Sequence, residues 1–247
     1  MPRRRLDHLL VERGLAPDLD LAARWVRAGL VYTNSARLEK PGMLIDAAES
    51  LTVKSPESPF VSRGGLKLQG ALRAFSHNPN GETAVDLGAS TGGFTDCLLQ
   101  YGARRVYAID VGRGQLHQRL LTDPRVHSRE RTHFDKLAAG DFANPPTLVV
   151  ADLSFISLAR AYPVIWRIMP DGGRAILLAK PQFEVTPDAL PPGGVLRDPA
   201  IQQEVLDRLT QAAAQIGFAL LGRCESPIHG ADGNREFFLY LDRPSSS

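Results

Sequence analysis

The chain has 247 residues, 43% of them hydrophobic and 23% charged, with a formal net charge of +2, which is typical of a folded globular protein. It holds no apolar run of about 18 residues and no N-terminal apolar core, which excludes a membrane span and a secretory signal. Cys97 and Cys224 lie far apart, which excludes a disulfide framework or a cysteine-based zinc site. We therefore expect a cytoplasmic protein with one or two domains.

The first sixty residues predict a small α+β unit. Apolar residues at helical spacing predict helices that end at Gly14 and Gly29, and short strands are expected at 30–33 and 51–53. A turn is expected at Asn34-Ser35. The Ser/Pro segment 55–59 then predicts a boundary between a domain of residues 1–58 and a domain of residues 59–247.

Parts of this unit resemble the small RNA-binding domain named after ribosomal protein S-four. The resemblance rests on residues 5–11, 22–31 and 40–42, while Tyr32-Thr33-Asn34-Ser35 departs from the usual Val-Asn-Gly of its hairpin. In that family a helix pair presents basic residues to RNA. The resemblance therefore implies RNA contacts for exposed arginines, although a merely solvated helix face is the alternative for each. The candidates are Arg4, Arg5, Arg24, Arg27 and, at the start of the second domain, Arg63.

The second domain alternates apolar strands with helices. Helices are expected over 68–75, 158–169 and 201–216, and strands at 84–87, 105–110, near 126, and at 146–152, 174–179, 218–221 and 236–241. Such runs predict a Rossmann-like α/β fold with a mostly parallel sheet covered by helices on both faces. Ligands of these folds bind beyond the carboxyl ends of the strands.

A Gly-rich loop joins the strand at 84–87 to the next helix. Asp110 ends the following strand 22 residues after Gly88, close to the roughly 20 residues between a Gly-rich turn and a ribose-binding carboxylate. The loop lacks the full G-x-G-x-x-G pattern and follows Asp86, which is more typical of S-adenosylmethionine sites. A plain strand-to-helix turn is the alternative. The candidate cofactor-binding residues are Asp86, Gly88, Ala89, Ser90, Thr91, Gly92, Gly93, Phe94, Asp110 and Asp152.

Four charged residues lie at or near predicted element ends: Lys67, Asp152, Lys180 and Glu236. Together they resemble the Lys-Asp-Lys-Glu tetrad of the FtsJ-like 2′-O-methyltransferases, which transfer a methyl group from S-adenosylmethionine to an RNA ribose. A neutral lysine could accept the hydroxyl proton, and a charged one would stabilise the developing alkoxide. The resemblance implies this role for Lys180, oriented by Asp152 and Glu236, with Lys67 positioning the ribose. Taken singly, each could be a solvated residue, and Asp152 could cap a helix.

Seven local sequences extend the resemblance over nearly the whole chain. These segments, and the order in which they follow the small N-terminal domain, resemble those of the TlyA family. The segments are residues 62–68, 86–97, 107–116, 152–157, 180–184, 193–199 and 233–237. That family methylates cytidine riboses of small- and large-subunit rRNA, and it has also been labelled haemolysin. The resemblance therefore implies S-adenosylmethionine as cofactor and rRNA or ribosomal subunits as partner. Residues 130–135 depart from the family pattern, although Glu130 or Asp135 could still reach the adenine.

Other chemistries are less compatible with the sequence. Methyltransferases that act on amino groups of nucleic acids usually have an Asn/Asp-Pro-Pro-aromatic motif, whereas the corresponding segment here, which begins at Asp152, lacks the prolines. Methyltransferases that act on pyrimidine carbon need an attacking thiolate, whereas both cysteines are expected to be structural. The histidines, including His229, show no metal-ligand spacing, so no metal is expected. A mobile lid is expected at 187–194. An RNA-binding assembly factor without essential catalysis and a membrane-lytic protein remain as alternative functions.

Overall fold

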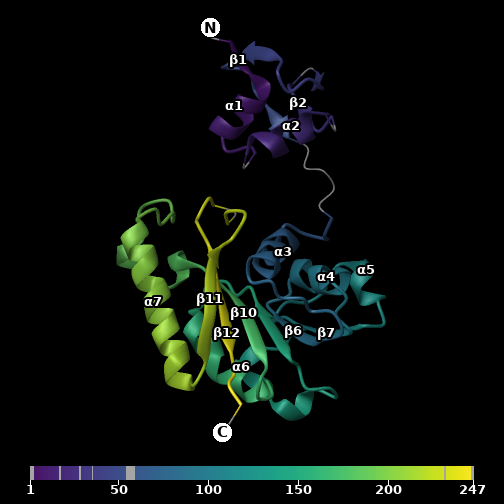
Figure 1. The fold of residues 1–247 in the computed structure, drawn as a ribbon, viewed down its shortest axis with the longest axis vertical. Coiled ribbons are helices and arrows are strands. Elements are labelled where there is room, and N and C mark those ends of the chain that lie inside the picture. Colours follow the sequence, from purple (N-terminus) through teal and green to yellow (C-terminus); the bar gives the residue numbers. More distant parts are fainter. Residues whose placement is uncertain are drawn as a thin grey trace. The chain divides into compact units, whose positions relative to one another are not determined.

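The computed structural model describes residues 3–16, 18–27, 29–34, 36–53, 59–230 and 232–245. The chain forms two compact units, Met1–Ser58 and Pro59–Ser247 (Figure 1). Three features expected from the sequence fall partly outside the described residues: the segment 55–59 apart from Pro59, Ser35 of the expected turn, and Ala28 at the end of the second helix.

The first unit packs two helices beside short antiparallel strands. Its core consists of apolar residues from both helices and from the central strand, among them Leu6, Leu10, Val26 and Val31. The helices end before glycines in the left-handed region, Gly14 at φ +66° and Gly29 at φ +68°. Strands β2 (Val31–Tyr32), β3 (Arg37–Leu38) and β5 (Thr52–Val53) form one sheet, and β1 (Arg3–Arg5) pairs with β4 (Leu44–Asp46). The helices are α1 (Leu6–Glu12) and α2 (Leu19–Arg27).

The second unit is built on a seven-stranded sheet with the order β11-β12-β10-β9-β6-β7-β8. Five strands are parallel, whereas β12 runs antiparallel to β10 and β11 antiparallel to β12. The chain enters at β6, proceeds outward to β8, and returns to place β9 on the other side of β6. The strands are β6 (Thr83–Leu87), β7 (Arg105–Ile109), β8 (Val126–Arg129), β9 (Leu148–Ala151), β10 (Arg174–Ala179), β11 (Ala219–Glu225) and β12 (Phe237–Asp242).

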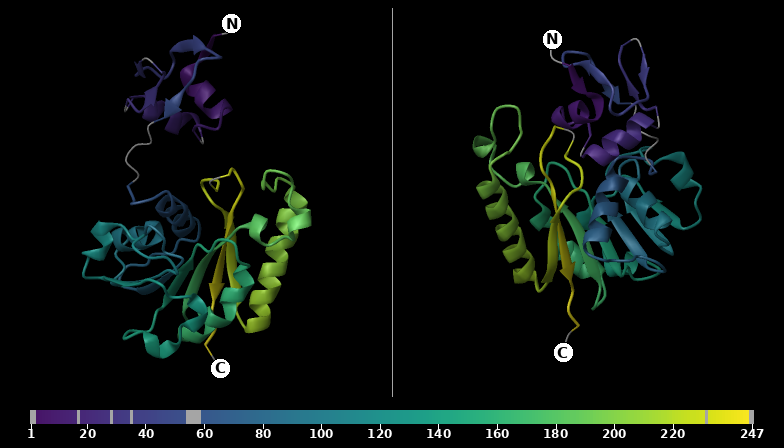
Figure 2. Two further views of the ribbon diagram at one scale, coloured as in Figure 1. Left: turned by 180° about the vertical axis from the view of Figure 1, so that it is seen from behind. Right: turned by 45° about the horizontal axis from the view of Figure 1, so that its top comes forward.

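Helices cover both faces of this sheet, as the two opposite views in Figures 1 and 2 show. Alternate residues of β6 point to different cores, Val85 and Leu87 to one and Ala84 to the other. The first core includes α6 (Tyr162–Ile168) and α7 (Pro199–Ile216). The second includes α3 (Gly64–Ala74), α4 (Gly93–Gln100) and α5 (Gln118–Leu121). The expected Rossmann-like α/β fold is thereby confirmed.

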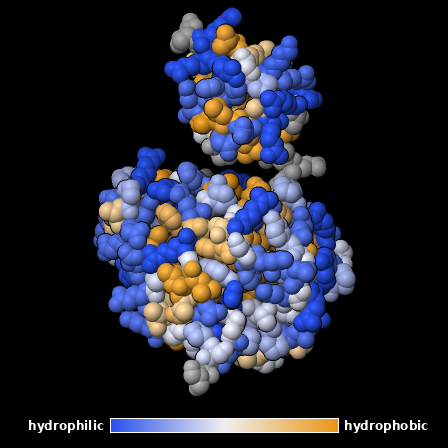
Figure 3. All heavy atoms as spheres, in the orientation of Figure 1, coloured by the Kyte–Doolittle hydropathy of each residue, from blue (hydrophilic) through white to orange (hydrophobic). Residues whose placement is uncertain are grey.

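Helix length and surface hydropathy bear on whether a chain can span a bilayer. Within the described ranges, no helix is both long and apolar enough to cross a bilayer. Hydrophilic and intermediate residues cover most of the face of each unit that is visible in Figure 3, with apolar residues in small patches.

Candidate active site

The Gly-rich loop between β6 and α4 approaches two other segments closely. Gly88, at φ +79°, lies so near β9 that a Cβ atom there would be 2.6 Å from the carbonyl oxygen of Asp152. A Cβ atom on Gly93 would be 2.8 Å from the amide nitrogen of Gly65, so this glycine allows α4 to begin against α3. Larger residues at either position would push the loop away from its neighbours.

This loop forms one wall of a cavity of about 400 Å³ at the carboxyl ends of β6 and β9. Most of the expected cofactor-binding residues line it, together with several residues that sequence reasoning missed or assigned elsewhere. The lining residues are Ser62, Arg63, Gly64, Lys67, Asp86, Gly88, Ala89, Ser90, Thr91, Gly93, Phe94, Asp152 and His229.

Asp86 is a fully buried carboxyl group in this cavity wall. Its Oδ2 accepts hydrogen bonds from the amide nitrogen of Thr95 at 2.9 Å and from the Thr95 hydroxyl at 2.7 Å. Oδ1 has no hydrogen-bond partner among the described residues. Burial raises the pKa of Asp86 to about 7, although the bonds from Thr95 oppose this, and the charge of Asp152 raises it further. A cationic ligand would stabilise the charged form.

Two of the expected cofactor-binding residues do not line the cavity. The carboxylate of Asp110 accepts hydrogen bonds from the amide nitrogens of Ser90 and Gly112, each at 2.7 Å, and thereby shapes the loop. Gly92, at φ +96°, precedes α4, and a Cβ atom there would be 2.2 Å from Leu120. The structure thus gives both residues a role in holding the loop, while a contact with cofactor stays a prediction.

The two acidic residues considered for adenine binding, Glu130 and Asp135, each contact another residue of the protein. Glu130 Oε1 accepts a hydrogen bond from the amide nitrogen of Gly114 at 2.7 Å. Asp135 forms an exposed ion pair with Arg160 at 3.5 Å. Neither residue lines the cavity, and their contact with adenine remains untested.

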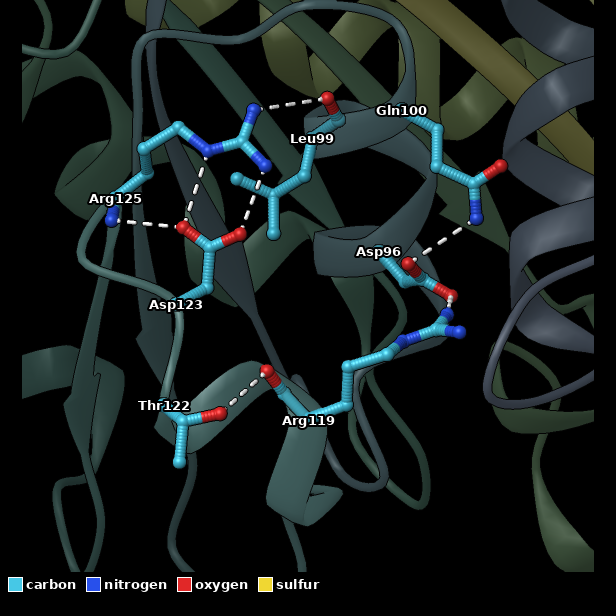
Figure 4. Close-up of polar contacts among 7 residues, drawn as sticks. All are labelled: Asp96, Leu99, Gln100, Arg119, Thr122, Asp123 and Arg125. Atoms are coloured by element: carbon cyan, nitrogen blue, oxygen red, sulfur yellow. Dashed lines mark hydrogen bonds and ion pairs between the residues drawn. The ribbon is translucent and has the colours of Figure 1, made fainter.

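The buried carboxylate of Asp96 joins polar side chains of α4 and α5 (Figure 4). Asp96 on α4 accepts hydrogen bonds from Arg119 of α5 at 2.5 Å and from the amide nitrogen of Val61 at 2.8 Å. Gln100, one turn along α4, donates to Asp96 at 3.2 Å and to the carbonyl oxygen of Pro59 at 2.7 Å. Asp96 therefore ties the first residues of the second unit to the helix that follows the Gly-rich loop.

The four charged residues form two ion pairs at this edge of the sheet. Lys67 Nζ lies 2.5 Å from Glu236 Oε2, and Lys180 Nζ lies 2.6 Å from Asp152 Oδ1. The register of β10 with β12 places Ala179 opposite Phe237, so Lys180 and Glu236 follow and precede neighbouring strands at the same edge. Both lysine side chains are at most 12% exposed.

Glu236, which was expected to orient Lys180 together with Asp152, forms its ion pair with another lysine. Glu236 holds Lys67 instead, because α3 carries Lys67 to the start of β12, while Asp152 and the hydroxyl of Ser154 take Lys180, the latter at 2.9 Å. The alternative capping role of Asp152 is not observed either, since the next helical turn begins at Leu158.

An exposed aromatic residue stands beside Lys180. Phe155 is 89% exposed and adopts φ +61°, a left-handed conformation that costs a non-glycine residue about 1–3 kcal/mol. Its ring centroid lies 4.8 Å from that of Phe183, whose ring in turn lies 5.6 Å from Lys180 Nζ. Sequence reasoning did not single out Phe155, because an apolar residue in such a motif is normally expected to be buried.

The arginines proposed to bind RNA are all described. Arg63 precedes α3, lines the cavity, and donates a hydrogen bond to the carbonyl oxygen of His229 at 3.2 Å. In the first unit, Arg4 pairs with Glu12 at 2.7 Å, and Arg5 pairs with Asp7, whose pKa it lowers. Four of the candidates are exposed side chains of β1 or α2: Arg4, Arg5, Arg24 and Arg27.

Burial determines the protonation of the two cysteine thiols. Burial raises the pKa of the Cys97 thiol, and it raises that of Cys224 to about 11, so neither is poised as a thiolate. In the part of the chain that the structure describes, no three His, Cys, Asp or Glu side chains are grouped so that they could hold a metal ion.

Comparison with known proteins identifies relatives along the whole chain. A model of the FtsJ-like methyltransferase family matches residues 60–243. The provisionally named rRNA methyltransferase YqxC of Bacillus subtilis is 45% identical over 98% of this chain and 86% of its own length. The 16S/23S rRNA (cytidine-2′-O)-methyltransferase TlyA of Mycobacterium tuberculosis is 42% identical over 97% of this chain and 90% of its own.

Solved structures agree with these sequence matches. A provisionally named hemolysin from Streptococcus thermophilus has a TM-score of 0.76 and 41% identity, covering 100% of this chain and 90% of its own. An S-adenosylmethionine-dependent methyltransferase from Mesorhizobium loti has a TM-score of 0.52 and 17% identity, covering 70% and 96%, and shares the fold.

Proposed function

The chain belongs to the FtsJ-like methyltransferase family, and we propose that it transfers a methyl group from S-adenosylmethionine to the ribose 2′-hydroxyl of a cytidine in rRNA. The observation that carries this proposal is the convergence of two ion pairs, Lys67–Glu236 and Lys180–Asp152, at the edge of a cavity walled by a Gly-rich loop. The activity for which the TlyA relative is named supports cytidine in small- and large-subunit rRNA as the substrate.

The cavity suits the proposed cofactor in shape and charge. Its glycines leave room for close approach to the main chain, and Asp86 Oδ1 is a buried acceptor that needs a donor. The ammonium group of the methionine part would supply that donor. When bound, S-adenosylmethionine supplies a methyl group activated by a positively charged sulfur.

The ion pairs supply what the ribose needs. A ribose hydroxyl is a weak nucleophile, so the group beside it has to stabilise negative charge on oxygen or accept the proton. Asp152 and Ser154 hold Lys180 Nζ in a fixed position for this task. Glu236 fixes Lys67, which lines the cavity and would orient the ribose. Such assistance is worth about 100- to 10,000-fold in rate.

Phe155 suits the recognition of an extruded base. Sequence-specific proteins stack unpaired bases of RNA on aromatic side chains, and enzymes that act on one nucleotide take it out of the stack. Phe155 is exposed, is held by Phe183, and lies on the loop that bonds Lys180 through Ser154. It would stack on the target base while Lys180 contacts the ribose.

The first unit would anchor structured rRNA. Its exposed arginines on β1 and α2 can contact phosphates. The ion pair of Arg4 with Glu12 does not prevent this, because both side chains are exposed, exposed pairs contribute little to stability, and a phosphate can replace the carboxylate.

The test is methyl transfer from labelled cofactor to separated small and large ribosomal subunits that lack the modification, followed by mapping of the product. We expect a 2′-O-methyl cytidine with the wild-type protein and with Lys136→Ala, an exposed-lysine control, but not with Lys180→Ala. A methyl group on a base would refute the mechanism. Full function of a folded, RNA-bound Lys180→Ala variant would favour an assembly factor without essential catalysis.

A further inference from the structure

The loop after β10 holds the loop after β9 at several points. Residues 180–184 follow β10, and residues 152–158 follow β9. Lys180 forms an ion pair with Asp152 and donates a hydrogen bond to the Ser154 hydroxyl, and the ring of Phe183 lies against that of Phe155. The last of these contacts involves Glu184. Its Oε2 accepts a hydrogen bond from the Ser157 hydroxyl at 2.7 Å, and its Oε1 accepts one from the amide nitrogen of Leu158 at 2.7 Å.

These contacts enclose the strained residue of the loop. Phe155 has φ +61° and an almost fully exposed ring, so its own burial contributes little to holding that conformation. Hydrogen bonds hold the chain on both sides of Phe155. On its N-terminal side, Ser154 accepts a hydrogen bond from Lys180. On its C-terminal side, the Ser157 hydroxyl and the Leu158 amide nitrogen donate hydrogen bonds to Glu184. The Glu184 carboxylate thus fixes the end of the turn from which Phe155 projects.

Glu184 has the properties of a structural anchor beside the site. It is partly buried, and burial raises its pKa while the two hydrogen bonds favour the charged form. Arg208 of α7 donates a hydrogen bond to its main-chain oxygen, which fixes the backbone as well. Its side chain does not line the cavity of the Gly-rich loop, so it is separate from the proposed cofactor site.

We propose that Glu184 is a positioning residue for the target nucleotide, which holds the 152–158 turn so that Phe155 stands beside Lys180 and stacks on the base. This inference rests on the proposed ribose methylation. It adds a residue that touches neither cofactor nor ribose, yet determines how the base is held.

A double-mutant cycle on RNA binding tests it. The dissociation constant of an rRNA fragment containing the target nucleotide is measured for wild type, Phe155→Ala, Glu184→Ala and the double variant. Glu204→Ala, an exposed glutamate of α7, is the control. We expect Phe155→Ala and Glu184→Ala each to bind the RNA about 5- to 150-fold more weakly than wild type, which is the range of base–aromatic stacking. The double variant should bind the RNA no more weakly than the weaker of these two single variants. The dissociation constant of S-adenosylhomocysteine should change less than about twofold.

Glu184→Gln separates positioning from folding. The amide oxygen can accept from Leu158, and the Ser157 hydroxyl can rotate to accept from the amide nitrogen, so this variant should recover most of the RNA affinity. Losses that multiply in the double variant, or wild-type affinity of Glu184→Ala, would overturn the inference. Ribose methylation by the wild-type protein is measured in parallel. Its absence would refute the proposed function, and the inference with it, whereas a multiplicative cycle in an active enzyme would refute the inference alone.

Discussion

We expect Asp86 to make both the stability of the protein and its affinity for the cofactor depend on pH. Burial raises its pKa to about 7 in the folded protein, against the ordinary aspartate value of 3.8 that applies when the chain is unfolded. The folded state therefore binds this proton more tightly than the unfolded state. Its contribution to stability is fully present below about pH 3.8 and is lost as the pH rises through about 7. A difference of about 3 between the two pKa values corresponds to about 4 kcal/mol.

Asp86→Asn removes this charge while keeping the shape of the side chain and an oxygen that can accept from Thr95. We expect the variant to be more stable than wild type by up to about 4 kcal/mol at pH 8, and the difference to vanish near pH 4. Urea denaturation at several pH values measures both. If the difference in unfolding free energy between Asp86→Asn and wild type does not grow with pH, the pKa assigned to Asp86 is wrong.

Cofactor binding should show the opposite preference. If the cofactor ammonium bonds Asp86 Oδ1, it binds the charged form, so the dissociation constant should rise about tenfold between pH 8 and pH 6. Titration calorimetry with S-adenosylhomocysteine, which retains the ammonium, measures this. Asp86→Asn should bind more weakly and lose most of the slope. An equal slope in wild type and variant would assign the titration to another group and refute the reasoning.

Three further variants test the site and its support. Lys180→Ala should lower kcat by about 100- to 10,000-fold in the labelled-methyl assay, with an unchanged dissociation constant for S-adenosylhomocysteine; a comparable loss of cofactor affinity would contradict its assigned role. Glu236→Ala should destabilise the protein by about 3–5 kcal/mol in urea, because it leaves the charge of Lys67 buried without a partner, and the added substitution Lys67→Met should restore part of this; no recovery would argue against the pair. Asp96→Ala should cost about 1–3 kcal/mol, since the Val61 amide loses its acceptor, and a neutral effect would show that water replaces the carboxylate.

The sheet of the second unit could be predicted because its strands are continuous apolar runs. Each of the runs at 84–87, 105–110 and 174–179 became a strand within one or two residues of the expected ends. The strand β1 could not be predicted in this way. It consists of three exposed arginines and exists because it pairs with β4, some forty residues away in the sequence. Local sequence holds no signal for such a partner.

For the candidate site, the sequence indicated which residues lie at this edge of the sheet better than it indicated which of them contact one another. The Gly-rich loop, Asp152 and Lys180 converge at one edge because the parallel strands β6, β9 and β10 end there, and Glu236 joins them because the antiparallel β12 begins there. Which lysine pairs with Glu236 depends on how α3 packs, across 169 residues of chain. Phe155 was missed for a related reason, because its exposure results from a left-handed turn held by residues 180–184.

The topology explains why Asp152 connects the two proposed ligand sites. The strand order reverses direction between β6 and β9, which is where open α/β sheets bind their ligands. Asp152 follows β9 directly: its main chain lies against Gly88 of the Gly-rich loop, and its carboxylate forms an ion pair with Lys180. Methyl transfer needs the ribose oxygen within about 3–3.5 Å of the methyl carbon. Asp152 belongs to the cavity wall and also forms an ion pair with the lysine proposed to contact the ribose, so it can couple the positions of the two proposed ligands.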